Sequence, residues 1–555
     1  MTDTPQSALA FDWSAGYTSQ RAPVFGRNVV ATSHPLGAQA GLRVLSQGGN
    51  AVDAAVAAAA AMTVLEPVSN GLGSDAFGMV WDGRALHGLN ASGCAPQAWS
   101  PAYFQGKYGA QTTAPPVRGW DTVTVPGAVA SWVALSRRFG KLRFAELMAP
   151  AIECAERGYG VTPIVQQKWA ASVPLLLDQP GFAQAFMPFG RAPEVGERFA
   201  WPAVARGLRL IGETEGEAFY RGEIAQALVR NAQVHGAALS LGDLASYEPE
   251  WVQPLSHDYR GHTLHELPPN GQGLAALMAL GMVRQFDLRA HGVDSVVSQH
   301  IQIEAMKLAF ADVYRYVGDP ASMPVSPQQM LDPDYLQARA RLIRLDRAQA
   351  FDAGRPDDVH RRGGTVYLTV ADAQGMMVSF IQSNYMGFGS GVVLPDYGVS
   401  LQNRGHSFSL DPRQVNVVAP GKRPFHTIIP GFLSRPGRGP GELEAQMAFG
   451  VMGANMQPQG QLQTLVRMLD FHQHPQAACD APRWRFNAGL EINVEPNMPA
   501  DRVQGLADLG HRMEVINDSY QDFGAGQFIW RLGDPAVDGY VAASDSRRDG
   551  QAVAW

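Results

Sequence analysis

The sequence predicts a mixed α/β (α+β) protein with a large core. A chain of 555 residues can bury about three quarters of the surface that its unfolded state exposes. Hydrophobic residues make up 46% of the chain and charged residues 17%, with a net charge of -7, which excludes disorder as the main state. Helix and strand patterns alternate over the first two thirds of the sequence, and strand patterns prevail in the last third.

The N-terminal region combines an arm, a strand and a helix. Residues 1–27 are polar and irregular, and predict an arm. Residues 29–32 (VVAT) predict a short strand, and residues 35–49 predict an amphipathic helix that ends at two glycines.

The Ala-rich run 51–65 (AVDAAVAAAAAMTVL) resembles a membrane span at first sight. It carries Asp53, ends at Glu66-Pro67, and is too short and too weakly apolar to cross a bilayer. We therefore expect a tightly packed internal helix, followed by the Gly-rich loop 70–78 (NGLGSDAFG). We interpret the aspartate of this loop, Asp75, as a residue that organises the loop by hydrogen bonds to the backbone.

The middle of the chain predicts helices and short strands up to about residue 320. Residues 122–140 predict a strand that breaks into a helix at Pro126, and residues 298–320 predict a long amphipathic helix. Residues 320–362 are polar and charged, which predicts an exposed, mobile segment. Directly afterwards, residues 365–384 predict a two-stranded hairpin.

Composition excludes several classes of partner. Neither the net charge nor any Lys/Arg-rich run supports nucleic-acid binding. Cys94, Cys154 and Cys479 stand far apart and form neither a disulfide framework nor a metal knuckle, which fits a reducing compartment. The first residues lack the basic and apolar pattern of a signal peptide. We therefore expect a cytoplasmic protein with no membrane or nucleic-acid partner.

Common catalytic motifs are absent from the sequence, which has no GxSxG elbow, no GxxxxGK[ST] loop and no HExxH pair. His472 and His474 have no further metal ligand at a suitable spacing, so we interpret them as solvated surface residues. We expect neither a metal nor an organic cofactor.

The junction Gly363-Gly364-Thr365 is the remaining candidate for a catalytic site, because it places a hydroxyl residue at the start of a predicted strand. If the Gly364–Thr365 bond were cut, Thr365 would carry both a hydroxyl and a free α-amine. An α-amine titrates near pH 7.7–8.0 in model peptides, so it can serve as general base for its own hydroxyl. Glycine at 364 lets the chain bend and exposes its carbonyl to the Thr365 hydroxyl. Taken alone, a Gly-Gly-Thr turn that leads into a strand is also an ordinary structural feature.

Several longer motifs resemble the γ-glutamyltransferase family. Residues 27–77 (RNVVATSHPLG…NGLGSDAF) are similar to its N-terminal signature, and residues 363–393 (GGTVYLTVADAQG…GFGSGVV) to the start of its small subunit. The resemblance spans residues 28–552 and includes VPGAVASWVALSRRFGKL, PGKRPFHTIIP and SDSRRDGQA.

The resemblance implies a four-layer αββα sandwich of the N-terminal-nucleophile hydrolases, made as a precursor that cuts itself before its threonine. It implies a large subunit of residues 1–364 and a small subunit of residues 365–555 in one intertwined core. The expected partners are a small-molecule amide substrate and these two subunits, and a homodimer of the processed protomer stays open.

The family's catalytic residues map onto this sequence by position. Thr365 corresponds to the nucleophile, and Ser383 to a second hydroxyl that hydrogen-bonds it. The oxyanion hole corresponds to Gly453 and Ala454, where only backbone N–H groups are needed.

The sequence departs from the family where γ-glutamyl enzymes bind the α-carboxylate and α-amine of their substrate. Ser92 stands in place of an Arg, Ser407 in place of an Asp, Tyr385 in place of an Asn, and Pro424-Phe425 in place of a Ser-Ser pair. Losing a buried partner of a charged group costs on the order of 2–5 kcal/mol, which argues against efficient glutathione turnover.

Four basic residues occupy the segments that surround the family's pocket: Arg404, Lys422, Arg423 and His426. With Tyr385 and Ser407 they are the candidate substrate-binding residues. A cationic pocket without an amine receptor suits an acyl group that bears a carboxylate and no amine. The resemblance extends to branches of the family that act as oxamate amidohydrolase or as glutaryl-type cephalosporin acylase.

The leading hypothesis is therefore a self-processing amidohydrolase or acyltransferase that acts on an oxamate-like or glutaryl-like amide. A glutathione hydrolase with γ-glutamyltransferase activity is the first alternative. A non-catalytic relative that binds small acids is the second.

Overall fold

Two seven-stranded sheets form the centre of the computed structural model, which describes residues 21–351, 364–439, 441–518 and 522–555. Neighbouring strands within each of the two sheets are antiparallel. Sheet I consists, in spatial order, of β21 (Gln551–Ala554), β2 (Val29–Thr32), β10 (Gly364–Ala371), β11 (Met377–Tyr385), β3 (Asp75–Trp81), β4 (Leu86–Ala91) and β7 (Glu250–Val252). Sheet II consists of β1 (Val24–Gly26), β20 (Tyr540–Ser544), β19 (Gly526–Arg531), β15 (Leu443–Val451), β14 (Gly431–Pro436), β9 (His262–Glu266) and β8 (Leu255–Tyr259).

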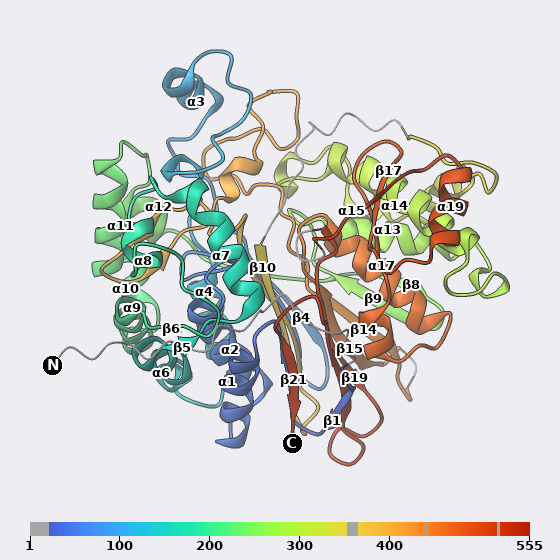
Figure 1. The fold of residues 1–555 in the computed structure, drawn as a ribbon, viewed down its shortest axis with the longest axis horizontal. Helices are drawn as coiled ribbons and strands as arrows, with labels where there is room; N and C mark the ends of the chain where they lie inside the picture. The colour runs from blue at the N-terminus through green and yellow to red at the C-terminus, as the bar shows by residue number, and fades with distance from the viewer. Residues whose placement is uncertain (1–20, 352–363, 440, 519–521) are drawn as a thin grey trace.

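Helices cover the outer face of each sheet, so the molecule has four layers in the order αββα (Figure 1). The helices on the side of sheet I are α1 (Pro35–Ser46), α2 (Ala51–Leu65), α3 (Pro101–Tyr108), α4 (Ala128–Phe139), α5 (Phe144–Leu147), α6 (Ala149–Arg157), α7 (Pro163–Leu176), α8 (Phe182–Phe186), α9 (Pro202–Glu213), α10 (Glu217–Tyr220), α11 (Glu223–Val234) and α12 (Leu241–Ala245). Those on the side of sheet II are α13 (Gly273–Val283), α14 (Val296–Tyr316), α15 (Pro327–Met330), α16 (Pro333–Ala340), α17 (Met456–Leu469), α18 (Pro475–Asp480) and α19 (Ala500–Asp508). The predicted four-layer sandwich is confirmed.

Smaller elements fill the connections between the layers. They are the pairs β5 (Tyr159–Gly160) with β6 (Arg198–Phe199) and β12 (Val393–Leu394) with β13 (Val399–Ser400), the sheet of β16 (Trp484–Phe486), β17 (Glu491–Val494) and β18 (Arg512–Val515), and the 3₁₀ turns η1 (Trp120–Thr122), η2 (Leu288–Ala290), η3 (Pro320–Ser322) and η4 (Arg404–Ser407).

Three hydrophobic clusters hold the layers together. One joins sheet I to α1, α2 and α4, a second joins sheet II to α13, α14 and α17, and a third lies between the sheets. Both sheets draw strands from before and after Gly364: β10 pairs with β2, for example, and β14 pairs with β9. Neither side of this residue could complete either sheet alone, which agrees with a single intertwined core.

The Ala-rich run forms α2 as predicted. All of its residues are buried, as expected for a helix that is apolar on every side. A capping box between Asn50 and Asp53 satisfies donors of its first turn. Among the described residues, no helix combines the length and the apolar character that a membrane span requires.

One prediction about local structure is wrong, and two others lie partly outside the described residues. Residues 123–125 are extended but pair with no strand, because the Val125 N–H donates to the Cys94 carbonyl and Gln402 donates to the Thr124 carbonyl. More than half of the described residues between 320 and 351 are exposed, as predicted, although the segment contains α15 and α16, whose Met330, Leu336 and Ala340 are buried in the cluster that joins sheet II to α13. Its last part, 352–363, lies outside the described residues, as do residues 1–20 of the predicted arm.

The predicted hairpin after residue 364 is confirmed to within one residue. It forms β10 and β11 in the middle of sheet I, where apolar neighbours bury both strands.

Candidate active site at the start of β10

Thr365 and Ser383 meet at the end of this hairpin. The Thr365 Oγ1 lies 3.2 Å from the Ser383 Oγ, and the two residues are 2% and 1% exposed. The register places Gly364 opposite Tyr385 and Val366 opposite Gln382, so one residue of β10 faces two of β11. Such a bulge redirects side chains, and here it brings the two hydroxyls together. The Tyr385 N–H also donates to the Ser383 Oγ, over 2.8 Å.

The Gly453-Ala454 turn lies toward the same end of β10. The Thr369 Oγ1 donates to the Ala448 carbonyl on β15, and a Cβ on Gly450 would lie 2.5 Å from the Tyr367 ring. Thr369 and Tyr367 of β10 thus lie against Ala448 and Gly450 of β15, in the facing sheet. From this alignment we infer that Thr365, two residues further along β10, faces the end of β15, directly before the turn. Gly453 and Ala454 have φ angles of 114° and 51°. Among the described residues, neither N–H group donates a hydrogen bond to another group.

A buried charged cluster lies beside this pair. Asp75 begins β3 opposite Ser383, and its Oδ2 lies 3.0 Å from the His426 Nε2. The Ile428 N–H donates to the His426 Nδ1, so the Nε2 carries the proton and donates to Asp75. Burial, reinforced by Arg404, holds the pKa of His426 well below its usual value, whereas burial raises the pKa of Asp75 to about 7. His426 is therefore neutral at pH 7, and the cation of the cluster is Arg404.

The Arg404 side chain is fully buried against Tyr385 and Thr427. Its guanidinium lies 4.0 Å from the centre of the Tyr385 ring, and its Nη1 donates to the Thr427 Oγ1 over 3.0 Å. A guanidinium over an aromatic ring is held in place without losing its charge. Tyr385 has a φ of 77°, a conformation that side chains other than glycine rarely adopt and that is concentrated at functional sites. Among the described residues, its buried hydroxyl has no hydrogen-bond partner.

The remaining predicted binding residues are engaged elsewhere. The Ser407 hydroxyl donates to the Arg404 and Phe425 carbonyls, which stabilises η4. The Lys422 Nζ donates to the Val415 carbonyl, over 2.7 Å. The Arg423 Nη1 forms an ion pair of 2.7 Å with Glu250. The structure therefore gathers Tyr385, Arg404 and His426 near Thr365, and uses Ser407 and Lys422 to brace the surrounding loops.

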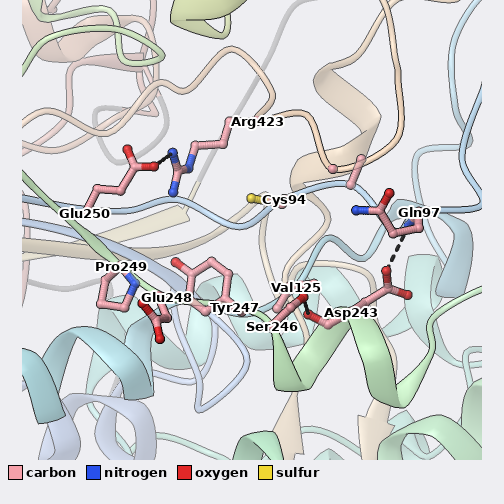
Figure 2. A pocket seen from close by; sticks show the side chains of 12 residues that line it. Cys94, Gln97, Val125, Asp243, Ser246, Tyr247, Glu248, Pro249, Glu250 and Arg423 are labelled. Atoms are coloured by element: carbon pink, nitrogen blue, oxygen red, sulfur yellow. Dashed lines mark hydrogen bonds and ion pairs between the residues drawn. The ribbon is translucent and has the colours of Figure 1, made fainter.

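A hollow of about 410 Å³ adjoins this region (Figure 2). Of the predicted site residues, only Arg423 lines it. Figure 2 shows Cys94 between Arg423 and Glu250 on one side and Gln97 and Asp243 on the other. Its wall is close to the charged cluster, because the Gly93 N–H donates to the Asp75 Oδ1 over 3.0 Å.

Asp75 is the residue of this site whose role the sequence interpretation underestimated. It does organise a loop, through Gly93, but it also faces His426 and Arg404. The available signal was a carboxylate at the head of the otherwise apolar run AFGMVW, since a buried carboxylate requires a partner.

Within the described residues, one group has the chemistry of metal ligands: His300, Glu304 and His511. Hydrogen bonds already use these atoms. The His300 Nε2 donates to the Arg344 carbonyl, so its Nδ1 accepts from the His511 Nε2, 2.8 Å away. The Lys307 ammonium lies 2.7 Å from Glu304 and 3.3 Å from the His511 Nδ1. A cation at the centre of the group and lone pairs that are engaged make this a hydrogen-bond network rather than a metal site.

This network predicts a loss of stability in acid. Burial lowers the pKa of His511 to about 2, against 6.5 in an unfolded chain. A lowered histidine pKa contributes stability that is complete above pH 6.5 and falls as the pH drops, by about 1.4 kcal/mol per unit. His511→Gln keeps a donor and an acceptor but does not titrate. Between pH 7.5 and 5.5 we expect its free energy of urea unfolding to fall by about 1.4 kcal/mol less than that of the wild type. Equal losses in both proteins would contradict this assignment.

Known proteins resemble this chain over nearly its whole length. The model of a family described as Gamma-glutamyltranspeptidase matches residues 37–555. The glutathione hydrolase-like YwrD proenzyme of Bacillus subtilis (strain 168) is 35% identical over 535 residues, which cover 95% of this chain and 98% of that protein. The oxamate amidohydrolase proenzyme of Klebsiella pneumoniae subsp. pneumoniae is 34% identical, over 94% of this chain and 97% of that protein. The crystal structure of cephalosporin acylase from Bacillus halodurans superposes with a TM-score of 0.92, at 46% identity and over 99% of both chains.

Proposed function

The chain belongs to the gamma-glutamyltranspeptidase family, and we propose that it is a proenzyme that cuts itself between Gly364 and Thr365 and then hydrolyses amides. Relatives named as hydrolases and acylases make it an enzyme, which sets the non-catalytic alternative aside. The observation that carries the proposal is the buried contact between the Thr365 and Ser383 hydroxyls, at the residue where the small subunit would begin.

Self-cleavage follows from the same hydroxyl. The Thr365 Oγ attacks the Gly364 carbonyl carbon, a C–O bond forms, and the C–N bond breaks as the proton passes to the departing nitrogen. Water then hydrolyses the ester, which leaves a carboxylate on Gly364 and a free α-amine and hydroxyl on Thr365. We propose large and small subunits of residues 1–364 and 365–555 from this cut.

The mature site works on an external amide in the same order. The α-amine of Thr365 takes the proton of its hydroxyl as the Oγ attacks the substrate carbonyl. The N–H groups of Gly453 and Ala454 are available to the oxyanion, and Ser383 orients the nucleophile. The proton moves to the leaving nitrogen, the amine departs, and water or another amine releases the acyl group from Thr365.

The acyl group that suits this site carries a carboxylate. Arg404 is buried and charged, whereas His426 is neutral, and Lys422 and Arg423 are bound to other groups. We propose that Arg404, with Tyr385, receives the carboxylate of an oxamate-like or glutaryl-like amide. Ser407 does not replace an Asp as the partner of an α-ammonium group, because a neutral hydroxyl supplies no negative charge.

A gel and a substrate panel test this function. The purified protein should give two fragments on a denaturing gel, with Thr365 as a new N-terminus. It should release ammonia or amine from oxamate or glutaryl amides faster than from γ-glutamyl anilides. A single unprocessed band would refute the proenzyme, and faster turnover of γ-glutamyl anilides would favour the glutathione hydrolase alternative.

Ser383→Ala should slow both self-cleavage and turnover. The variant removes one hydrogen bond to the nucleophile, worth about 1.5–3 kcal/mol when the partner is charged, so kcat should fall about 10- to 100-fold. Ser383→Thr retains the hydroxyl and should keep most of the activity. Rates of precursor conversion and steady-state kinetics measure both variants, and an unchanged kcat in Ser383→Ala would contradict the role.

A further inference from the structure

The proposed oxyanion turn, Gly453-Ala454, holds an alanine in a conformation that alanine rarely adopts. Ala454 has a φ of 51°, in the left-handed region, and is 1% exposed. Such a conformation persists only where the surrounding groups fix the backbone. We propose that Gln272 and Gly524 are these groups, as positioning residues that aim the two N–H groups of the turn at the reacting carbonyl. This inference rests on the proposed function and adds to it two residues outside the contact between the hydroxyls.

Gln272 holds the turn through its side-chain amide. The Nε2 donates to the Ala454 carbonyl over 2.9 Å and to the Thr427 carbonyl over 2.6 Å, so both protons of the amide are used. The Gln457 N–H donates to the same Ala454 carbonyl over 3.1 Å. Two donors on one carbonyl fix the peptide that follows Ala454, and they thereby keep this residue in the left-handed region.

Packing alone does not explain a glutamine at position 272. The side chain is fully buried, and its Oε1 has no hydrogen-bond partner among the described residues. A buried acceptor without a partner is unfavourable, and an apolar side chain of the same shape would avoid it. The two hydrogen bonds that the Nε2 donates give the glutamine a reason to be there.

The same amide ties the oxyanion turn to the surroundings of Arg404. Gln272 directly precedes α13, and its main-chain N–H donates to the His426 carbonyl over 3.0 Å. Thr427, whose carbonyl accepts from Gln272, also accepts from Arg404 on its hydroxyl. One side chain thus fixes the separation between the guanidinium that binds the acyl carboxylate and the turn that binds the acyl carbonyl.

Gly524 orients the turn by leaving room for a carbonyl. A trans peptide points its N–H away from its C=O, so the Gly453 N–H points away from the Met452 oxygen. A Cβ on Gly524 would lie 1.8 Å from that oxygen, and Gly524 has a φ of 65°. A side chain there would force the peptide to rotate, and the Gly453 N–H with it. In the same way, the Met456 N–H holds the Gly453 carbonyl over 2.9 Å, which turns the Ala454 N–H to the opposite side.

A thionoester tests the oxyanion contact, because sulfur accepts hydrogen bonds more weakly than oxygen. The substrates are monoethyl glutarate and its thiono analogue, in which C=S replaces the ester C=O. Gln272→Met keeps the length of the side chain and removes its donors. We expect kcat/KM for the oxygen ester to fall about tenfold, and the oxygen-to-sulfur ratio of kcat/KM to fall with it. Gly524→Ala should lower the same ratio.

Two further variants are matched controls. Gln463→Met removes a buried glutamine of α17 that also donates to two main-chain carbonyls, those of Gln459 and Trp484. Gly106→Ala adds a methyl group where no other group lies within 4 Å. Both controls should keep the wild-type ratio, whatever they do to stability. Because a general defect lowers both rates equally, a wild-type ratio in either of the first two variants would overturn the role of that residue.

A second measurement needs no turnover. The sequence contains two Met-Gly pairs, at 386–387 and 452–453, so protein labelled with carbonyl-¹³C methionine and ¹⁵N-glycine gives two selected amide signals in NMR. Gly387→Ala adds a Cβ that lies 3.5 Å from the nearest atom, and its missing signal identifies the other one as Gly453. Gln272→Met should shift the Gly453 signal, and the glutamine control of α17 should not.

The two measurements separate this inference from the proposed function. An unshifted Gly453 signal in Gln272→Met would overturn the positioning role, whether or not the enzyme hydrolyses esters. A wild-type enzyme that hydrolyses neither ester would refute the glutaryl assignment and leave the NMR result to decide the positioning role.

Discussion

Replacement of Thr365 by alanine is expected to leave a full-length precursor without amidase activity. The variant lacks the hydroxyl that we propose attacks both the Gly364 carbonyl and the substrate, and alanine offers no group that could form the acyl intermediate. Loss of a catalytic nucleophile typically lowers kcat by about 10⁴-fold or more. A denaturing gel and N-terminal sequencing report the processing, and amide hydrolysis reports the turnover.

Thr365→Ser is the matched control. It keeps a hydroxyl at the same position of β10, opposite the bulge of β11, and should therefore still undergo self-cleavage and hydrolyse the substrate. Processing of Thr365→Ala with a new N-terminus at residue 365 would refute Thr365 as the attacking group.

Replacement of Arg404 by methionine should remove the preference for acyl groups that carry a carboxylate. A buried charge partner is worth about 2–5 kcal/mol, so kcat/KM for a glutaryl amide should fall by about 30- to 4000-fold. The matched hexanoyl amide carries no carboxylate and should be affected far less. The ratio of the two kcat/KM values is the measurement, since a purely structural defect would lower both equally.

Arg404→Met also leaves Asp75 without the guanidinium that opposes its protonation. Its pKa should rise further, and the variant should be less stable. The double variant Asp75→Asn/Arg404→Met removes both charges and should regain stability without regaining the glutaryl preference. A double variant that recovers the preference would show that Arg404 acts through Asp75 rather than on the substrate.

Local sequence patterns predicted the fold well where they depend on near neighbours. The capping residues and apolar run of α2, and the alternation in β10 and β11, are short-range signals, and the structure confirms them. The patterns failed at residues 123–125, which pair with no strand. There the deciding partners, Cys94 and Gln402, are distant in the sequence.

The sequence, through its Gly-Gly-Thr junction and its resemblance to the family, indicated which residues could do chemistry: Thr365, Ser383 eighteen positions later, and the basic residues between positions 404 and 426. The tertiary structure decided which of those basic residues share the site. It buried Arg404 against Tyr385, made His426 neutral beside Asp75, and turned Lys422 and Arg423 toward the Val415 carbonyl and Glu250. The reason is that charge and burial depend on neighbours hundreds of residues away, such as Asp75 for His426, which spacing along the chain does not encode.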